Sequence, residues 1–347
     1  MTKNPPTKSP STKSRALGKV TLSDVAARAG VAPMTASRAI NQPELVSAIL
    51  RERVEKAVQD LGYVPNRAAR ALASAQSKVI VVLVPSLANT VFTAVLAGVQ
   101  DALDPCNYQI LIGNTRYSDA EEEKLLATYM QSNPDGILLC GLTHSPRVQQ
   151  MLATSRVPVV SMMDLSSEPG ALSVGFSQED AGYTITRYLI DKGRKRIGYM
   201  AAQLDERTLK RGDGYRKAME EAGLADPMLE LMCPDPSTIA LGAELLGRML
   251  ANMPGLDAIF CCNDDLAHGA IFQCQRRGIK VPEQLAICGF NDLPASAWMK
   301  PSVTTVGTPR YQTGFEAANL LLATSRGNDV PARRIDLGFT LMARESA

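Results

Sequence analysis

Two different spacings of apolar residues divide the chain. Between residues 20 and 62 apolar side chains recur every three or four positions in three short stretches, which is the period of an α-helix. From residue 79 onward short continuous apolar runs alternate with helical stretches, and the runs are Val79–Val84, Gln109–Ile112, Ile137–Cys140, Pro158–Met162, Ile197–Met200, Ala258–Cys262 and Leu285–Gly289. Apolar strands that alternate with helices indicate parallel sheets covered on both faces. About 270 residues of this pattern exceed one ordinary domain, so we expect two α/β lobes with doubly wound sheets.

The three N-terminal helical stretches carry recognisable end signals. Thr-Leu-Ser-Asp at 21–24 is a capping box in which Thr21 begins the first helix, and Gly30 ends it. Pro33 fits the first position of a second helix that runs to about residue 40. Ser47 is expected to cap the third helix, which Gly62 ends. These signals predict a small all-α unit.

The predicted organisation has four parts. Residues 1–18 combine three prolines with repeated Thr-Lys and Ser-Lys pairs and almost no apolar side chain, which predicts a disordered basic tail. A transit peptide is the alternative for this tail, although it lacks the amphipathic Arg-rich pattern. Residues 19–64 form the three-helix domain, residues 65–77 an Ala- and Arg-rich linker, and residues 78–347 the two-lobed domain.

Charge is distributed unevenly between these parts. The formal net charge is +2, but residues 1–77 hold 12 Lys and Arg against 5 Asp and Glu, whereas the other 270 residues hold 25 against 30. A basic head on a mildly acidic body indicates a polyanionic partner for the head alone.

Composition excludes several classes of protein. No 18 apolar residues run together and no secretory segment is found at the N-terminus, so we expect a cytoplasmic protein without a membrane span. Seven cysteines without a C-x-x-C pair argue against a disulfide framework and the usual zinc patterns. With only two histidines, no G-x-x-x-x-G-K loop and no G-x-G-x-x-G motif, we expect no catalysis, no metal and no cofactor.

Two short helices joined by a tight glycine turn and packed by a third form a helix-turn-helix unit, whose second helix enters the major groove of DNA. The outward residues at the start of that helix are Pro33, Met34, Thr35, Ser37 and Arg38. Arg38 can bond two acceptors on guanine, whereas Thr35 and Ser37 suit phosphate or sugar. Pro33 and Met34 can read only shape or a thymine methyl. A three-helix domain that binds protein is the alternative, which the basic excess disfavours.

The head residues carry a family resemblance. Val20–Ala26, Ala29–Val31, Thr35–Asn41 and Gly62–Asn66 resemble the N-terminal signature of LacI/GalR-family repressors, and the similarity continues in order to about residue 341. The chain departs from the family at residue 32, an Ala where a Ser usually caps the recognition helix, and at Pro33-Met34, which replaces a more polar pair. An operator sequence therefore cannot be carried over from relatives.

The resemblance gives the linker a role. It implies that residues 66–74 become a helix only on operator DNA, where two such helices lie in the minor groove. Leu72 matches a leucine that wedges into the central base step, which costs a few kcal/mol of unstacking. The full set of DNA-contact residues expected is Thr21, Pro33, Met34, Thr35, Ser37, Arg38, Asn66, Arg67, Arg70, Ala71 and Leu72.

The body resembles the periplasmic-binding-protein fold, in which two lobes enclose a cleft. We expect the first lobe to run from residue 79 to about 174 and the second to about 304, after which the chain returns to the first lobe and ends in the second. Ligands bind where strand ends point into such a cleft. The candidates are Ser86, Asn89, Phe92, Arg116, Tyr117, His144, Asp164, Phe176, Arg207, Thr208, Arg211, Asn263 and Asn291.

Within the family, the resemblance is strongest to gluconate-operon repressors, in residues 85–92, 143–147, 204–208 and 336–340. It implies gluconate, or a phosphorylated or oxidised relative, as the inducer. Arg207 and Arg211 are the candidates for its carboxylate, because arginine bonds carboxylates in a fork. A purine corepressor is the alternative ligand, which Phe92 and Phe176 would stack against.

The resemblance also implies how the parts work together. A homodimer joined through the body lobes would place two recognition helices on the half-sites of a pseudo-palindrome. Ligand would close the cleft and release the DNA. No C-terminal leucine heptad precedes Ala347, so we expect a dimer rather than a tetramer.

Overall fold

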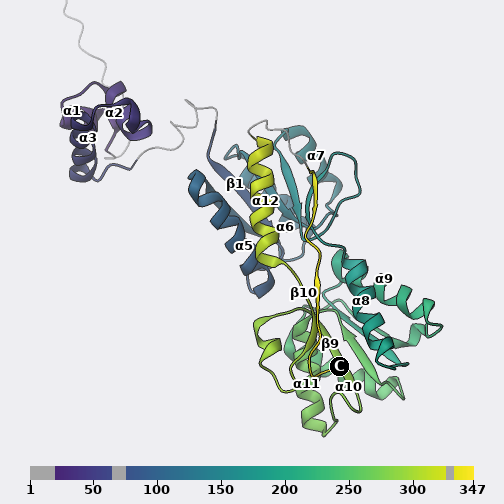
Figure 1. Ribbon diagram of the computed structural model, residues 1–347. Helices are drawn as coiled ribbons and strands as arrows, with labels where there is room; N and C mark the ends of the chain where they lie inside the picture. The colour runs from purple at the N-terminus through teal and green to yellow at the C-terminus, as the bar shows by residue number, and fades with distance from the viewer. Residues whose placement is uncertain (1–19, 65–75, 326–331) are drawn as a thin grey trace, which may run out of the picture. The chain divides into compact units, whose positions relative to one another are not determined.

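The computed structural model describes residues 20–64, 76–325 and 332–347 (Figure 1). The chain divides into two units, one up to Ala75 and the other from Gln76 to Ala347. The linker residues expected to contact DNA, Asn66, Arg67, Arg70, Ala71 and Leu72, lie outside the described residues.

The first unit contains the helices α1 (Leu22–Ala29), α2 (Pro33–Asn41) and α3 (Ala48–Leu61), with the 3-10 turn η1 (Pro43–Leu45) before α3. Small side chains allow the helices to approach closely, and the core consists of Val25, Ala26, Ala29, Ala36, Ala39, Val54 and Ala57. The Nη2 of Arg53 on α3 donates to the carbonyl oxygen of Ala29 at 2.6 Å. This bond ties the third helix to the turn between the first two.

The end signals of these helices are confirmed with one exception. Thr21 and Asp24 form the reciprocal capping box, and Gly30 ends α1 in the left-handed conformation that glycine allows (φ +63°). Ala32 begins α2 without a side-chain cap, as its methyl group requires. Ser47 stands at the expected start of α3, but its hydroxyl makes no capping hydrogen bond there.

The second unit contains two six-stranded sheets in its described part, one in each lobe. The first sheet has the order β11-β5-β4-β3-β1-β2 and is parallel throughout. Its strands are β1 (Val79–Val84), β2 (Gln109–Asn114), β3 (Gly136–Cys140), β4 (Val159–Met162), β5 (Leu172–Gly175) and β11 (Arg334–Asp336). Helices α5 (Thr90–Leu103), α6 (Asp119–Met130), α7 (Pro146–Ser155) and α12 (Arg310–Ser325) cover it, with the turn η2 (Asp104–Cys106).

The second sheet has the order β12-β10-β9-β8-β6-β7 and is parallel except for the β10–β12 pair. Its strands are β6 (Ile197–Ala202), β7 (Glu230–Cys233), β8 (Ala258–Cys261), β9 (Ala286–Asn291), β10 (Thr304–Gly307) and β12 (Thr340–Met342). Around it lie α8 (Gln178–Asp191), α9 (Glu206–Glu221), α10 (Ile239–Asn252) and α11 (Asp264–Arg277), with the turns η3 (Pro227–Leu229) and η4 (Pro294–Ala297). The α/β class with doubly wound parallel sheets is therefore confirmed.

The order in which the chain visits the lobes also agrees with the expectation. It passes to the second lobe after β5, returns to the first lobe in α12 and β11, and ends in the second lobe after β12 (Figure 1). In the first lobe α5 and α12 lie side by side, and glycine permits their contact. A Cβ atom at Gly314 would stand 1.9 Å from the carbonyl oxygen of Val95.

Candidate functional sites: a recognition helix and an interlobe cavity

The start of α2 presents an exposed face in the first unit. Pro33, Met34 and Arg38 are exposed, and Met34 keeps 65% of its surface. The guanidinium of Arg38 makes no hydrogen bond to another described residue, so its donors are available to a partner. Thr35 and Ser37 are half-buried.

Thr21, the other expected DNA contact in this unit, serves the helix end. Its Oγ1 accepts from the backbone nitrogen of Asp24 at 3.3 Å and donates to the Asp24 carboxylate at 2.8 Å. The side chain is exposed, so the capping role leaves its outer face open.

A cavity of about 460 Å³ lies between the lobes of the second unit. Its wall is formed by residues that follow β1, β2 and β4 on one side and β6, β7, β8 and β9 on the other. The expected ligand residues that line it are Ser86, Asn89, Phe92, Arg116, Tyr117, Arg207, Thr208, Arg211, Asn263 and Asn291. Side chains distant in sequence thus converge because parallel strands end at one edge of each sheet.

Arg207 stands near the start of α9 with its charge already paired. Its Nη2 lies 2.5 Å from the Asp205 carboxylate, and its guanidinium carbon lies 5.4 Å from the centre of the Phe92 ring. Burial alone would lower the pKa of Arg207, but Asp205 raises it above the usual value. The pKa of the Asp205 carboxyl shifts in the opposite direction. Burial would raise this pKa, but Arg207 and Arg211 hold it below the usual value. The pair is a neutral element of the wall.

Arg211 is different because it forms no ion pair with any described residue, and the Asp205 carboxylate acts on it only from a distance. Its Nε donates to Gln178 Oε1 at 2.8 Å and its Nη1 to the carbonyl oxygen of Cys262 at 2.6 Å. The guanidinium carbon lies 3.8 Å from the centre of the Phe290 ring, and only 6% of the residue is exposed. Burial lowers the pKa of Arg211, yet arginine stays protonated at neutral pH. Its Nη2 makes no hydrogen bond to a described residue, so both N–H groups of this nitrogen are available in the cavity.

Amides and hydroxyls supply the remaining polar groups. Asn263 caps α11 through its Oδ1, and its Nδ2 donates to Ser237 Oγ at 2.8 Å. Asn89 caps α5 in the same way, and Ser86 Oγ accepts from the backbone nitrogens that follow it. These groups are fixed in place before any ligand arrives.

Asn291 ends β9 in a strained backbone conformation, with φ +106°. Only 6% of the residue is exposed, and its side-chain amide makes no hydrogen bond to another described residue although it lines the cavity. Strain of this kind persists where the surrounding structure imposes it, often at ligand sites.

The structure places three of the expected ligand residues, His144, Asp164 and Phe176, outside the cavity wall. The Nδ1 of His144 turns to the Glu122 carboxylate on α6, 3.0 Å away. The Asp164 carboxylate accepts from Lys210 Nζ at 2.6 Å and is almost fully buried.

Phe176 follows β5 at the crossing between the lobes. Its ring packs 6.3 Å from Phe290 and 6.2 Å from Phe339 in the core of the second lobe. The ring therefore has no face free to stack on a ligand.

The cavity wall also includes residues that the sequence reading did not single out, namely Asn114, Met163, Gln203, Ser237, Thr238 and Asp265. Asn114 ends β2, so the strand-end rule would have found it had the strand been extended by two residues. Ser237 follows β7, which was not predicted because this edge strand begins at Glu230 and is half-exposed. Burial raises the pKa of Asp265, whose carboxylate has no partner among the described residues.

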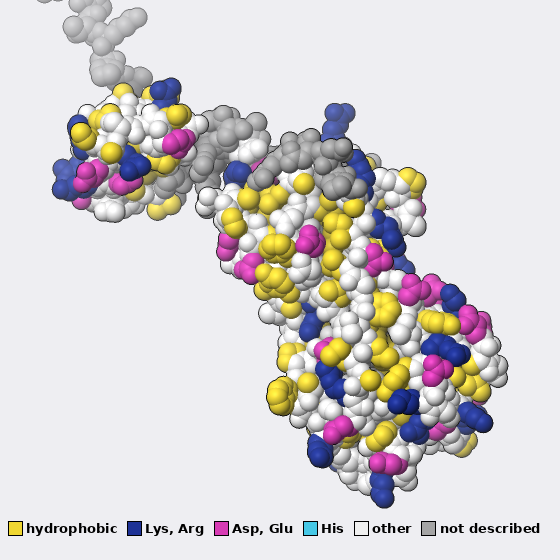
Figure 2. Space-filling model, viewed as in Figure 1, with side chains coloured by type: hydrophobic (Ala, Val, Ile, Leu, Met, Phe, Trp, Pro, Cys, Tyr) yellow, Lys and Arg dark blue, Asp and Glu magenta, His cyan; other side chains and the backbone are white. Residues whose placement is uncertain are grey.

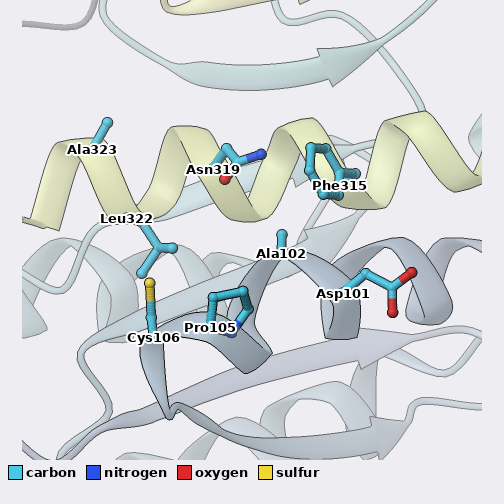
Figure 3. A pocket seen from close by; sticks show the side chains of 8 residues that line it. All are labelled: Asp101, Ala102, Pro105, Cys106, Phe315, Asn319, Leu322 and Ala323. Atoms are coloured by element: carbon cyan, nitrogen blue, oxygen red, sulfur yellow. The ribbon is translucent and has the colours of Figure 1, made fainter.

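A second hollow lies between α5 and α12 on the outside of the first lobe (Figure 3). Phe315, Asn319, Leu322 and Ala323 approach it from α12, opposite the segment from Asp101 to Cys106. Hydrophobic side chains gather on this face of the molecule (Figure 2). The hollow has no cation and few polar groups, so it does not suit a small charged ligand.

Two kinds of feature are absent from the described residues. No three His, Cys, Asp or Glu side chains stand close enough to hold a metal ion there. No helix in this part of the chain is long and apolar enough to cross a membrane.

Comparison with known proteins matches both units. The family described as bacterial regulatory proteins, lacI family, covers residues 21–66. The family of periplasmic binding proteins and sugar binding domain of LacI family covers residues 77–337. The HTH-type transcriptional regulator GntR of Pseudomonas aeruginosa is 48% identical over 332 residues, which are 96% of this chain and 97% of the relative.

Solved structures give the same result. The transcription regulator GntR from Chromobacterium violaceum has a TM-score of 0.76 at 51% identity, over 77% of this chain and 98% of that one. The Lac repressor dimer bound to operator and the anti-inducer ONPF has a TM-score of 0.83 at 26% identity, over 94% of this chain and 99% of that one.

Proposed function

The chain belongs to the LacI family of bacterial regulatory proteins and is a DNA-binding transcriptional regulator, not an enzyme. From this premise we propose that it represses gluconate-type catabolic genes and leaves its operator when gluconate, or a close relative such as 6-phosphogluconate, binds the interlobe cavity. It acts in the cytoplasm as a homodimer on a pseudo-palindromic operator.

The observation that carries this proposal is the unpaired charge of Arg211. A buried cation is costly unless an anion or several hydrogen bonds compensate it. Arg211 has two hydrogen bonds, an aromatic face and no carboxylate, whereas Arg207 beside it is neutralised by Asp205. An acidic ligand would supply the missing counter-ion, so Arg211 rather than Arg207 is the better candidate for the carboxylate.

The rest of the wall suits a chain of hydroxyl groups. Asn263, Asn291, Ser237 and Thr208 offer amides and hydroxyls around the arginine, and the Asp265 carboxylate can accept from a hydroxyl. A polyol acid needs a cation for its carboxylate and several polar groups for its hydroxyls. A purine corepressor is less well supported, because the Phe176 ring is occupied in the core.

Release of DNA would follow from closure of the cavity. Two polar contacts already join the lobes at its side: Thr143 Oγ1 donates to Glu206 Oε2 at 2.7 Å, and Lys210 Nζ lies 2.6 Å from Asp164. A ligand held by both lobes would favour the closed form over the open one. The resulting coupling would weaken operator binding by roughly 1–3 kcal/mol, or about 5–150-fold.

The homodimer is supported by an exposed aromatic pair on the second lobe. Trp298 keeps 90% of its surface and Phe272 keeps 41%. The neighbours of Phe272 on α11 reach the same segment as Trp298, since His268 contacts Ser296 and Gln275 bonds to the Lys300 carbonyl. Aromatic residues are enriched in protein–protein interfaces, so this part of the surface is our candidate for the dimer contact.

Titration calorimetry of the purified chain with gluconate, 6-phosphogluconate, 2-ketogluconate and hypoxanthine tests the ligand. We expect saturable heat with one sugar acid at one site per chain, and loss of that heat in Arg211→Ala. Arg216→Ala is the matched control, because Arg216 lies on the same helix but pairs with Asp213 and Glu230 away from the cavity. Heat with hypoxanthine alone, or equal binding by both variants, would contradict the proposal.

A further inference from the structure

A buried carboxylate lies directly behind the cavity wall. Asp264 is the first residue of α11, stands between the cavity residues Asn263 and Asp265, and has no exposed surface. Its Oδ1 accepts from Thr305 Oγ1 at 2.7 Å. Its Oδ2 accepts from the Leu293 backbone nitrogen at 2.6 Å and from Ser296 Oγ at 2.9 Å. One side chain thus joins β10, the turn after β9 and η4.

This carboxylate is held without a cation. No Lys, Arg or His of the described residues forms an ion pair with it; Arg310 and Asp292 are the charged groups that act on it electrostatically, and His268 reaches it only through Ser296. Gly289 on β9 makes the room, since a Cβ atom there would stand 2.1 Å from Oδ1. A buried charge of this kind contributes little to stability, so we looked for a segment that the carboxylate holds in position.

The element that it positions is the turn that carries Asn291. Asn291 and Asp292 both have positive φ angles, +106° and +52°. The backbone nitrogen of the next residue, Leu293, bonds directly to Asp264. The backbone nitrogen of Asp292 donates to Thr305 Oγ1 at 3.3 Å, and that hydroxyl in turn donates to Asp264. Both bonds converge on one carboxylate and oppose relaxation of the strained turn.

We propose that Asp264 is a positioning residue of the effector site: its carboxylate holds the turn at residues 291–293 so that the unpaired amide of Asn291 faces the ligand. Asp264 itself does not line the cavity. The inference relies on the proposed function only for the choice of gluconate as the probe.

The binding test is a double-mutant cycle measured by calorimetry with gluconate. In Asp264→Asn one side-chain atom becomes a donor, so the three donors can no longer all be accepted. We expect at least tenfold weaker gluconate binding in Asp264→Asn and in Asn291→Ala, and no further loss in the double variant, because both act through one group. Losses that multiply would show that Asp264 does not act through Asn291. Asp119→Asn is the control, because Asp119 holds the same first position in α6 but is exposed.

The second test needs no ligand. Hydrogen exchange of the full-length chain should become faster in Asp264→Asn for peptides that cover residues 290–296, and stay unchanged for residues 197–202 in β6. Unchanged exchange at 290–296, or faster exchange throughout the second lobe, would overturn the inference. If the wild-type chain gives no heat with gluconate, the proposed function fails while the exchange result still decides the role of Asp264.

Discussion

Arg38 is the described residue on which base recognition would depend. It is exposed on α2 and its guanidinium is unpaired within the described chain. We expect Arg38→Ala to weaken operator binding by about 1–3 kcal/mol and to leave binding to random DNA nearly unchanged, because a forked contact to guanine is lost. Gel-shift titrations on both DNAs measure this difference.

Arg51→Ala provides the control for charge. Arg51 lies on α3, where it pairs with Glu55 at 3.7 Å, so its removal subtracts the same charge away from the recognition helix. Equal losses on operator and random DNA in Arg38→Ala would show that Arg38 contacts only the backbone.

Asp264 and His268 titrate in opposite senses around one hydroxyl. Ser296 Oγ lies 2.9 Å from the carboxylate and 2.8 Å from His268 Nε2. Burial raises the pKa of Asp264 to about 6, from ~3.9 in the unfolded chain. As the pH falls, the folded chain therefore binds a proton at Asp264 before the unfolded chain does. Lowering the pH from 6 to 4 thus stabilises the fold through Asp264. Burial lowers the pKa of His268 to about 4 from ~6.5, so the same change of pH destabilises the fold through His268.

Removing one partner should expose the effect of the other. In Asp264→Asn only His268 of the two groups can still titrate. We therefore expect the free energy of unfolding of this variant, relative to that of wild type, to fall as the pH drops from 6.5 to 4. His268→Gln should show the opposite trend. Urea unfolding of each variant at several pH values measures this, and parallel curves for all three proteins would contradict the opposition.

Side-chain direction explains which site residues could be read from the sequence. His144 and Asn263 follow strands and Asn291 is the last residue of one, so the rule that ligands bind at strand ends named all three. The rule places a backbone and does not orient a side chain. The His144 ring points to the Glu122 carboxylate of its own lobe, and no residue near His144 in the sequence indicates that contact. An ion pair of Arg207 with Asp205, two residues before it, was one of two readings that the sequence left open, and the structure shows that pair.

At the scale of elements, the recognition helix has an uncapped start. Ala32 stands at its N-cap with the extended backbone of a capping residue (φ −70°, ψ 148°) but no side-chain oxygen. We expect Ala32→Ser to stabilise α2 by about 1 kcal/mol, because its hydroxyl can accept from a free backbone N–H. Slower hydrogen exchange in α2 of the full-length chain would measure the gain.

Thr21→Ala gives the converse at α1. It removes an existing capping box and should cost a similar amount, seen as faster exchange in α1. If Ala32→Ser leaves the exchange of α2 unchanged while Thr21→Ala alters α1, the start of α2 is not limited by its cap.

Elements with strong local signals were predictable, and those fixed by distant partners were not. β1 is apolar at every position and buried on both faces, and α1 carries both of its end signals. In contrast β11 and β12 have three residues each, and none of these residues is buried. Such strands form because they pair with the free edge of a neighbouring strand. The paired residues are more than 30 positions apart in sequence.

At the scale of the whole molecule, the exposed Trp298 tests the homodimer. We expect Trp298→Ser to shift the chain from dimer to monomer at micromolar concentration, because burying a tryptophan contributes strongly to an interface. Sedimentation velocity of wild type and variant measures the shift. Met228→Ser is the control. Met228 is likewise well exposed, at 73%, but it lies at η3. A dimer of unchanged strength in Trp298→Ser would place the interface elsewhere.

The contacts between the lobes should set how readily the cavity closes. Glu206 accepts from Thr143 of the first lobe and pairs with Lys210 at 2.8 Å, and Lys210 reaches Asp164 of the first lobe. Burial would raise the pKa of Glu206, but these bonds hold it below the usual value, so the group is charged at neutral pH. Glu206→Gln removes that charge and leaves the size of the side chain unchanged.

A smaller closed population lowers the apparent affinity in proportion, so we expect Glu206→Gln to weaken effector binding several-fold and to raise the effector concentration needed for operator release. Small-angle scattering should show a larger radius of gyration for the variant without effector. Glu221→Gln, at the other end of α9, is the control because Glu221 bonds Tyr183 within the second lobe. Wild-type affinity and wild-type scattering in Glu206→Gln would mean that the ligand alone holds the lobes together.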